Sequence, residues 1–348
     1  AAGGFKTVTL KGATAVHLGG SIITDENTAG NNIDIDGPVS LTANTTLDTT
    51  ANNGTIDFSS TIDSGSSTNH TLTLKSAAGS IAVNGVIGGT SGNTDIGALK
   101  INDGLSGTGA ITLSGIGASG KDGVTGTVDI GHTSTSAVNL KGSLYRINGA
   151  TTITTTSGAN KVDIQAAQTI QTGNDDLHFV GGGVKLSSNL TIDTGSGAGK
   201  VEFDGAIEAD DATSFDDSLA ITSGSGDVTF TGAVGATNAL GGLTINTSAG
   251  DGDITFSSTI GDGSNPGISG TTTIGGTATE NVHFGSSIYS FDGGITTITA
   301  TTDSDGSGDD ENIEVAVTTE FTAAGEAIKF VGGKIDLAND ANLTITSG

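Results

Sequence analysis

The stretch Leu219–Gly261, LAITSGSGDVTFTGAVG-ATNALGG-LTINTSAGDGDITFSSTIG, contains the pattern that decides the fold. Each half holds three short runs in which apolar residues alternate with small or polar ones. The first run is L-x-I, the second is V/I-T-F, and the third ends at Val234 or Ile260, directly before a glycine. Alternation with a period of two is typical of a half-buried β-strand. The Gly, Ser, Asn and Asp residues between the runs favour turns, so each half predicts three short strands.

A unit of about two dozen residues cannot bury its own apolar face, and it must therefore stack on the next copy of itself. The sequence predicts an all-β fold, a parallel β-helix (β-solenoid) of about a dozen rungs with three short strands each. With parallel rungs about 4.8 Å apart, the apolar residues form continuous interior columns. Because parallel crossovers are right-handed in the great majority of cases, we expect a right-handed solenoid.

Two levels of repetition extend along the chain. Successive first runs lie 24 to 29 residues apart, and the whole series recurs after about 145 residues. SLYRINGATTITTTSG (143–158), for example, is matched by SIYSFDGGITTITATTD (287–303), and Leu144 and Ile288 are expected to end equivalent third runs. The core positions expected in the second series are Ile192, Phe203, Ile207, Ile221, Phe230, Val234, Ile245, Phe256, Ile260, Ile274, Phe284 and Ile288.

The repeats also predict the domain organisation. We expect residues 1–348 to form one continuous solenoid, with super-repeats over roughly 35–178 and 179–330 and partial repeats at both ends. Length changes between copies fall in polar stretches such as 303–312, which is where surface loops tolerate insertions.

Composition and charge exclude several classes of partner. The chain has 38 acidic against 12 basic residues and a formal net charge of −26. Binding to nucleic-acid phosphates requires clustered Lys and Arg, so nucleic acid is not an expected partner. No apolar run reaches transmembrane length, so membrane insertion is not expected either. The chain has no cysteine, which excludes disulfides and thiolate chemistry.

The repeats, of the form LTI-(T/S)SG-x-GDVTF-x-GAVG-x₅-LGGLTINT, resemble those of giant bacterial secreted and cell-surface proteins. These include the filamentous-haemagglutinin-like adhesins and related fibre-forming exoproteins. The resemblance covers nearly the whole chain from about Leu41 onward. It implies a solenoid that acts as a stalk or fibre shaft, located outside the cell or on the bacterial cell surface.

One acidic stretch has the spacing of a twelve-residue calcium loop. Oxygen-bearing side chains at the first, third and fifth places would be followed by a closing carboxylate at the twelfth, with Gly308 at the sharp turn. Two features weaken the match, since Asp310 occupies a place that is commonly apolar and no helical pattern flanks the loop. A solvated acidic loop is the alternative, and no cofactor is required. The candidate calcium ligands are Asp303, Asp305, Ser307, Asp309, Glu311 and Glu314. The acidic residues of 208–217 are a weaker candidate.

Nothing in the sequence assigns a catalytic residue. Fragments similar to pectin-hydrolase motifs occur, such as Asn93-Thr94-Asp95 and Arg146-Ile147-Asn148, but their order differs from that family's. Paired carboxylates act on glycosides only when both face one cleft at a defined separation. The five histidines stand singly, without the spacing of a transition-metal site. We therefore expect a protein that is not an enzyme.

The expected function is structural, as the shaft of an adhesin or a surface filament. Unpaired strand edges at the ends of a solenoid favour stacking, so the expected partner is the protein itself, either head-to-tail or through adjacent repeats of a longer chain. The alternative is a surface module that binds glycans or calcium.

Overall fold

A computed structural model describes residues 6–24, 30–65, 68–89, 95–247, 252–301, 312–338 and 340–347. The chain forms a parallel β-solenoid of about 12 turns with three strands per turn, and 53% of the described residues are strand, which confirms the predicted fold class. One short 3₁₀ helix, η1 (Thr50–Asn52), occurs among these residues. The chain divides into two compact units, residues Ala1–Ser157 with Lys161–Gln171, and residues Gly158–Asn160 with Thr172–Gly348.

In the first unit each of the three runs forms its own parallel ladder. The first runs pair through the second half of β2 (Val16–Ile23), the second half of β4 (Val39–Asp48), β7 (Leu72–Lys75), β9 (Leu99–Ile101), β11 (Val128–Gly131) and the start of β14 (Thr151–Ile164). The second runs pair through β1 (Val8–Lys11), β3 (Ile33–Asp36), β5 (Ile56–Phe58), β8 (Ile81–Val83), β10 (Ile111–Leu113), β12 (Val138–Leu140) and the end of β14. The third runs pair through the starts of β2 and β4, β6 (Ile62–Ser64), single bridges at Ile87 and Ile116, β13 (Leu144–Arg146) and β15 (Gln168–Gln171).

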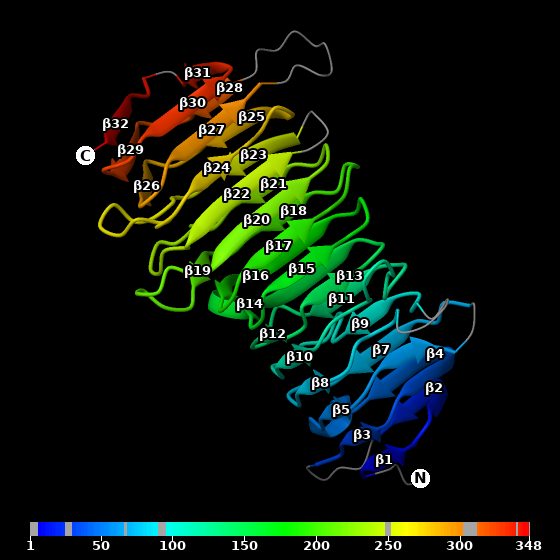
Figure 1. Cartoon of the computed structure of the whole chain (residues 1–348). Helices are drawn as coiled ribbons and strands as arrows, with labels where there is room; N and C mark the ends of the chain where they lie inside the picture. The colour runs from blue at the N-terminus through cyan, green and yellow to red at the C-terminus, as the bar shows by residue number, and fades with distance from the viewer. Residues whose placement is uncertain are drawn as a thin grey trace. The chain divides into compact units, whose positions relative to one another are not determined.

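The second unit repeats this arrangement, and Figure 1 shows the strands of its first-run ladder side by side. That ladder consists of β17 (Leu190–Asp193), β20 (Ser218–Ser223), β22 (Gly242–Thr247), β24 (Thr272–Ile274), β27 (Thr296–Ala300) and β30 (Ile328–Gly332). The second-run ladder consists of the start of β16 (Leu177–Leu186), β18 (Val201–Phe203), β21 (Val228–Phe230), β23 (Gly252–Phe256), β25 (Thr279–Phe284), β28 (Asn312–Val315) and β31 (Lys334–Leu337). The third-run ladder consists of the end of β16, β19 (Ile207–Ala209), bridges at Val234 and Ile260, β26 (Ile288–Asp292), β29 (Thr319–Ala324) and β32 (Leu343–Ser347).

A column of stacked phenylalanine rings lines the core of the second unit. Neighbouring rings are nearly parallel, with centroids 4.8 to 5.7 Å apart and interplanar angles of 3 to 8°. This spacing follows from the in-register ladder, which brings identical side chains into contact at the distance between strands. Every ring of the column is at most 1% exposed. The rings belong to Phe179, Phe203, Phe230, Phe256 and Phe284.

A row of polar side chains joins successive turns at or close to the start of the second-run strands. The Oδ1 atom of Asp227 accepts the backbone N–H of Asp253 at 3.3 Å, and Oδ1 of Asp253 accepts that of Asn281 at 3.1 Å. Asn281 then accepts the N–H of Asn312, also at 3.1 Å. Each of these side chains therefore accepts a hydrogen bond from a backbone N–H group of the next solenoid turn, at a place where no backbone carbonyl of the strand ladder accepts it.

The third-run ladder corrects one predicted core position. Tyr289, and not Ile288, pairs with Ile260, and Ile288 is only half-buried. In the first unit Tyr145 likewise takes the inward place expected for Leu144. Tyrosine is tolerated there because the hydroxyl of Tyr289 accepts the N–H of Ser286 (2.9 Å) and donates to the carbonyl oxygen of Phe256 (3.2 Å).

The other predicted core positions of the second series have inward-facing, buried side chains. Each is at most 1% exposed: Ile192, Phe203, Ile207, Ile221, Phe230, Val234, Ile245, Phe256, Ile260, Ile274 and Phe284.

Candidate functional site

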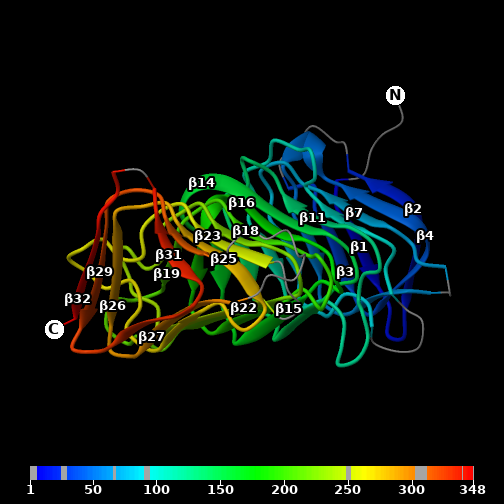
Figure 2. The ribbon, with the colours of Figure 1, turned by 90° about the horizontal axis from the view of Figure 1, so that it is seen from above.

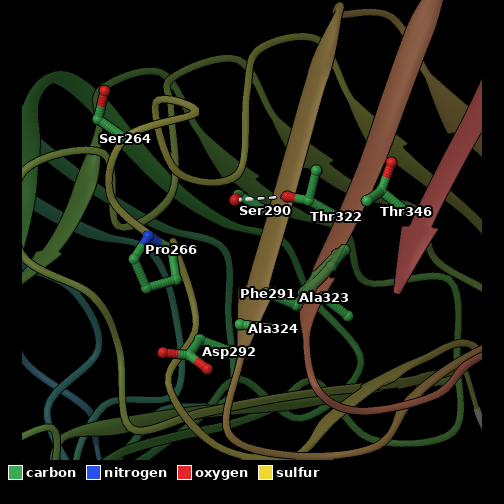
Figure 3. Close-up of a pocket in the computed structure, with 9 residues that line it drawn as sticks. All are labelled: Ser264, Pro266, Ser290, Phe291, Asp292, Thr322, Ala323, Ala324 and Thr346. Atoms are coloured by element: carbon green, nitrogen blue, oxygen red, sulfur yellow. Dashed lines mark hydrogen bonds between the residues drawn. The ribbon is translucent and has the colours of Figure 1, made fainter. Parts of the chain in front are cut away.

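A groove of about 430 Å³ opens on the outer face of the third-run ladder in the second unit. Its floor is formed by the adjacent strands β26, β29 and β32, which Figure 2 shows side by side. One wall is the loop that follows Ile260. The groove is lined by Ser264, Pro266, Ser290, Phe291, Asp292, Thr322, Ala323, Ala324 and Thr346 (Figure 3).

Two glycines anchor the two ends of the loop that forms this wall. The N–H of Gly261 donates to the carbonyl oxygen of Val234 (2.8 Å), and that of Gly267 donates to the carbonyl oxygen of Ser290 (2.8 Å). Gly261 has φ of +73°, and a Cβ there would lie 2.5 Å from the carbonyl oxygen of Asn265. Only glycine fits this position without a shift of backbone.

A carboxylate fixes the tip of the same loop. Oδ1 of Asp262 accepts the backbone N–H groups of Ser264 (2.8 Å) and Asn265 (2.6 Å). These hydrogen bonds, first that of Asn265 and then that of Ser264, lower the pKa of Asp262 because they favour its charged form. The loop is therefore held in one conformation beside the strands.

The floor of the groove presents hydroxyl groups in register. Ser290, Thr322 and Thr346 occupy paired positions of β26, β29 and β32. The hydroxyls of Ser290 and Thr322 are 2.7 Å apart, and Ser290 is only 8% exposed (Figure 3). Figure 3 shows the Pro266 ring and the Asp292 carboxylate at the opposite side of the groove. The groove thus combines hydroxyl groups, one carboxylate and an apolar ring, which suits a ligand that donates hydrogen bonds.

Most of the candidate calcium loop lies outside the described residues. This applies to Asp303, Asp305, Ser307, Asp309 and Glu311. The remaining candidate ligand, Glu314, lies on the outer face of β28, and its Oε2 is 2.5 Å from Nδ1 of His283.

His283 lies between two carboxylates of neighbouring turns. Besides Glu314, its Nε2 is 3.5 Å from Oδ2 of Asp253 on the preceding turn. Hydrogen bonding to Asp253, and to a lesser degree the charge of Glu314, raises the pKa of His283 despite its partial burial. Burial alone would raise the pKa of Asp253, but the hydrogen bonds from His283 and Asn281 lower it. Nothing in the local sequence pattern points to this cluster, and its one signal is the in-register alignment of the three second runs.

The acidic stretch 208–217 is organised around backbone contacts. The carboxylate of Glu208 accepts the N–H groups of Thr237 (3.0 Å) and Asn238 (2.8 Å), although burial raises its pKa. The pKa of Asp217 is raised to about 6, first by burial and then by the nearby charge of Asp210. Across the described ranges, no three His, Asp or Glu side chains form a group that could hold a metal ion.

Over the same part of the chain, no helix is sufficiently long and apolar to span a membrane. Comparison with known proteins gives no matching family model, no matching curated protein and no matching solved structure.

Proposed function

We propose that the protein is a structural β-solenoid, a segment of the shaft of an extracellular bacterial adhesin or surface filament. The observation that carries this proposal is the repetition of one set of contacts, turn after turn, in all three ladders. Parallel pairing and the phenylalanine column make each turn the template for the next. The stiffness of the shaft then comes from the repeated pairing and packing of many residues, and it does not depend on any single side chain.

The shaft extends through its end faces. In the last described turn, β30, β31 and β32 each pair with the preceding turn only, within the part of the chain that the structure covers. Their apolar side chains are exposed, at 40% for Ile335, 41% for Leu337 and 47% for Ile345. Ile345 is in register with Phe321, which is fully buried. An open strand edge with an apolar face accepts another strand, so a further turn of the same repeat fits here. We propose that a second copy of the chain, or an adjacent repeat, supplies that turn.

Electron microscopy and light scattering of the purified chain over a range of concentrations test this proposal. We expect assemblies that lengthen with concentration. Ile345→Lys should abolish them, because it places a charge in the stacking face, whereas Thr344→Lys on the other face of the same strand should not. A chain that stays monomeric at every concentration, or that assembles equally well with Ile345→Lys, would contradict stacking.

Repeating the assembly experiment with a chelator distinguishes the shaft from the alternative, a calcium-dependent surface module. The plain shaft should assemble equally in EDTA. Loss of assembly on chelation, with recovery on adding calcium, would favour the alternative.

A further inference from the structure

The groove beside Ser290 has a counterpart in the first unit, 144 residues earlier in the chain. There the loop Gly117–Gly123 takes the place of Gly261–Gly267, and Arg146 takes the place of Ser290. The two loops make the same backbone hydrogen bonds. In the first unit these bonds run from the N–H groups of Gly117, Ala118, Gly123 and Asn148 to the carbonyl oxygens of Ile87, Lys121, Arg146 and Val124, in that order. In the second unit the equivalent bonds run from the N–H groups of Gly261, Asp262, Gly267 and Asp292 to the carbonyl oxygens of Val234, Asn265, Ser290 and Ile268.

In the first unit a guanidinium group occupies this place. Nε of Arg146, the only arginine of the chain, donates to Oδ1 of Asp122 in the loop at 2.8 Å. Its Nη1 donates to Oε1 of Gln171 on the next strand at 3.2 Å. The side chain of Arg146 is 34% exposed, so most of it is covered by these neighbours. The loop and the ladder are therefore bridged by a cation of the chain itself.

In the second unit the same backbone lacks that cation. Serine, proline and threonine stand at the positions equivalent to Arg146, Asp122 and Gln171, which leaves the groove open. At the same time, the amide of Asn148 is replaced by the carboxylate of Asp292, which lines the groove. The second site thus lacks the Arg146–Asp122 ion pair and presents the carboxylate of Asp292 without a cation of the chain at the equivalent place.

We propose that this groove binds a guanidinium group, the side chain of an arginine on a partner protein, in the place that Arg146 occupies in the first unit. Its planar fork of N–H donors matches the acceptors that line the groove, the hydroxyl oxygens of Ser290 and Thr322 and the carboxylate of Asp292. The apolar ring of Pro266 supplies a surface against which one face of the group can pack. The net charge of −26 attracts such a partner over a longer range.

The test uses N-acetyl-arginine amide as the probe in an NMR titration of the isotope-labelled chain. We expect saturable shifts confined to the backbone amides of residues 262–265, 267, 290–292 and 322–324. N-acetyl-lysine amide should bind at least about tenfold more weakly, because a point charge cannot use the acceptors of the groove together. A neutral monosaccharide at the same concentration should produce no shifts.

Two variants locate the site. Asp292→Asn has the same size and should weaken arginine binding by about tenfold, the loss expected for one charge-assisted hydrogen bond. The pair Ser290→Arg with Pro266→Asp rebuilds the arrangement of the first unit and should abolish binding by filling the groove. Ser287→Arg adds the same charge at an exposed residue directly before β26, outside the groove lining, and should leave binding unchanged apart from a general charge effect.

Several results would overturn the proposal. These are shifts spread over the whole acidic surface, equal affinity for the arginine and lysine probes, undiminished binding by Asp292→Asn, and binding of the monosaccharide in preference to arginine. If Ser290→Arg with Pro266→Asp does not fold, Asp292→Asn alone decides between these outcomes.

Discussion

The rings of Phe230 and Phe256 stack in parallel, with centroids 4.8 Å apart and 3° between their planes. They belong to adjacent strands that are paired residue for residue. Each ring is 1% exposed, so the contact between them excludes water. Dispersion and burial together therefore make the column stabilising.

Truncation in this column should be costly. We expect Phe256→Ala to lower the free energy of unfolding by about 3–5 kcal/mol, because it removes a buried ring and leaves a cavity between two others. Thr255→Ala, on the outer face of the same strand, should change it by less than about 1 kcal/mol. Urea denaturation monitored by circular dichroism measures both. A loss below about 1 kcal/mol for Phe256→Ala would mean that the column carries little of the stability.

The hydroxyl of Tyr289 should matter separately from its ring. Tyr289→Phe leaves the N–H of Ser286 without its acceptor in a part-buried place, and we expect a loss of about 1–3 kcal/mol in unfolding free energy. Tyr145→Phe provides the matched test in the first unit, where the hydroxyl accepts the N–H of Gly142 and donates to the carbonyl oxygen of Leu113. Equal stability of wild type and both variants would show that water replaces the hydroxyl.

His283 should make stability dependent on pH. Its pKa is raised above 6.5 in the folded state, so the contribution of the charged ring is fully present below that ordinary pKa and is lost as the pH rises through the folded-state pKa. We therefore expect His283→Gln to cost more at about pH 5.5 than at about pH 9. The control is Glu314→Gln, in which NMR titration should show the pKa of His283 moving back towards 6.5. A cost of His283→Gln that grows with pH would contradict the sign of this coupling.

The first position of the loop beside the groove, Gly261, should accept only glycine. Gly261→Ala introduces both a positive φ and a Cβ 2.5 Å from a carbonyl oxygen. Gly263→Ala, in the same loop, has a similar φ of +83° but no contact closer than 3.4 Å. We expect about 1 kcal/mol of destabilisation for Gly263→Ala and at least about 2 kcal/mol for Gly261→Ala, measured by thermal denaturation. Equal effects of the two substitutions would mean that the loop shifts to make room.

The sequence predicted the ladders well because a strand's inward side chains alternate visibly. Phe203, Phe230, Phe256 and Phe284 stand at equivalent places in the repeat, and in-register pairing then brings them together. The prediction that Ile288 faces inward was wrong by one residue, because both Ile288 and Tyr289 are apolar enough for the core. Which of the two faces inward depends on whether the backbone offers hydrogen-bond partners to the Tyr289 hydroxyl. Such partners are brought near by the preceding turn and are not visible in the local pattern.

The groove could not be predicted because it depends on outward residues, which no hydrophobic period constrains. A comparison of Arg146 with Ser290 across the 144-residue offset was the available signal, but its meaning required knowing that Asp122 and Gln171 surround the arginine. The calcium loop remains a prediction, since all but one of its candidate ligands lie outside the described residues.

The buried pair Tyr145 and Tyr289 gives the protein a built-in optical reporter for each compact unit. The chain has no tryptophan and only these two tyrosines, so its tyrosine fluorescence comes from one residue in each unit. Replacing either with phenylalanine leaves the other as a single-site probe. Melting of the two halves can therefore be followed independently without attaching a dye, and a mismatch between the two curves would reveal at once that they unfold in separate steps.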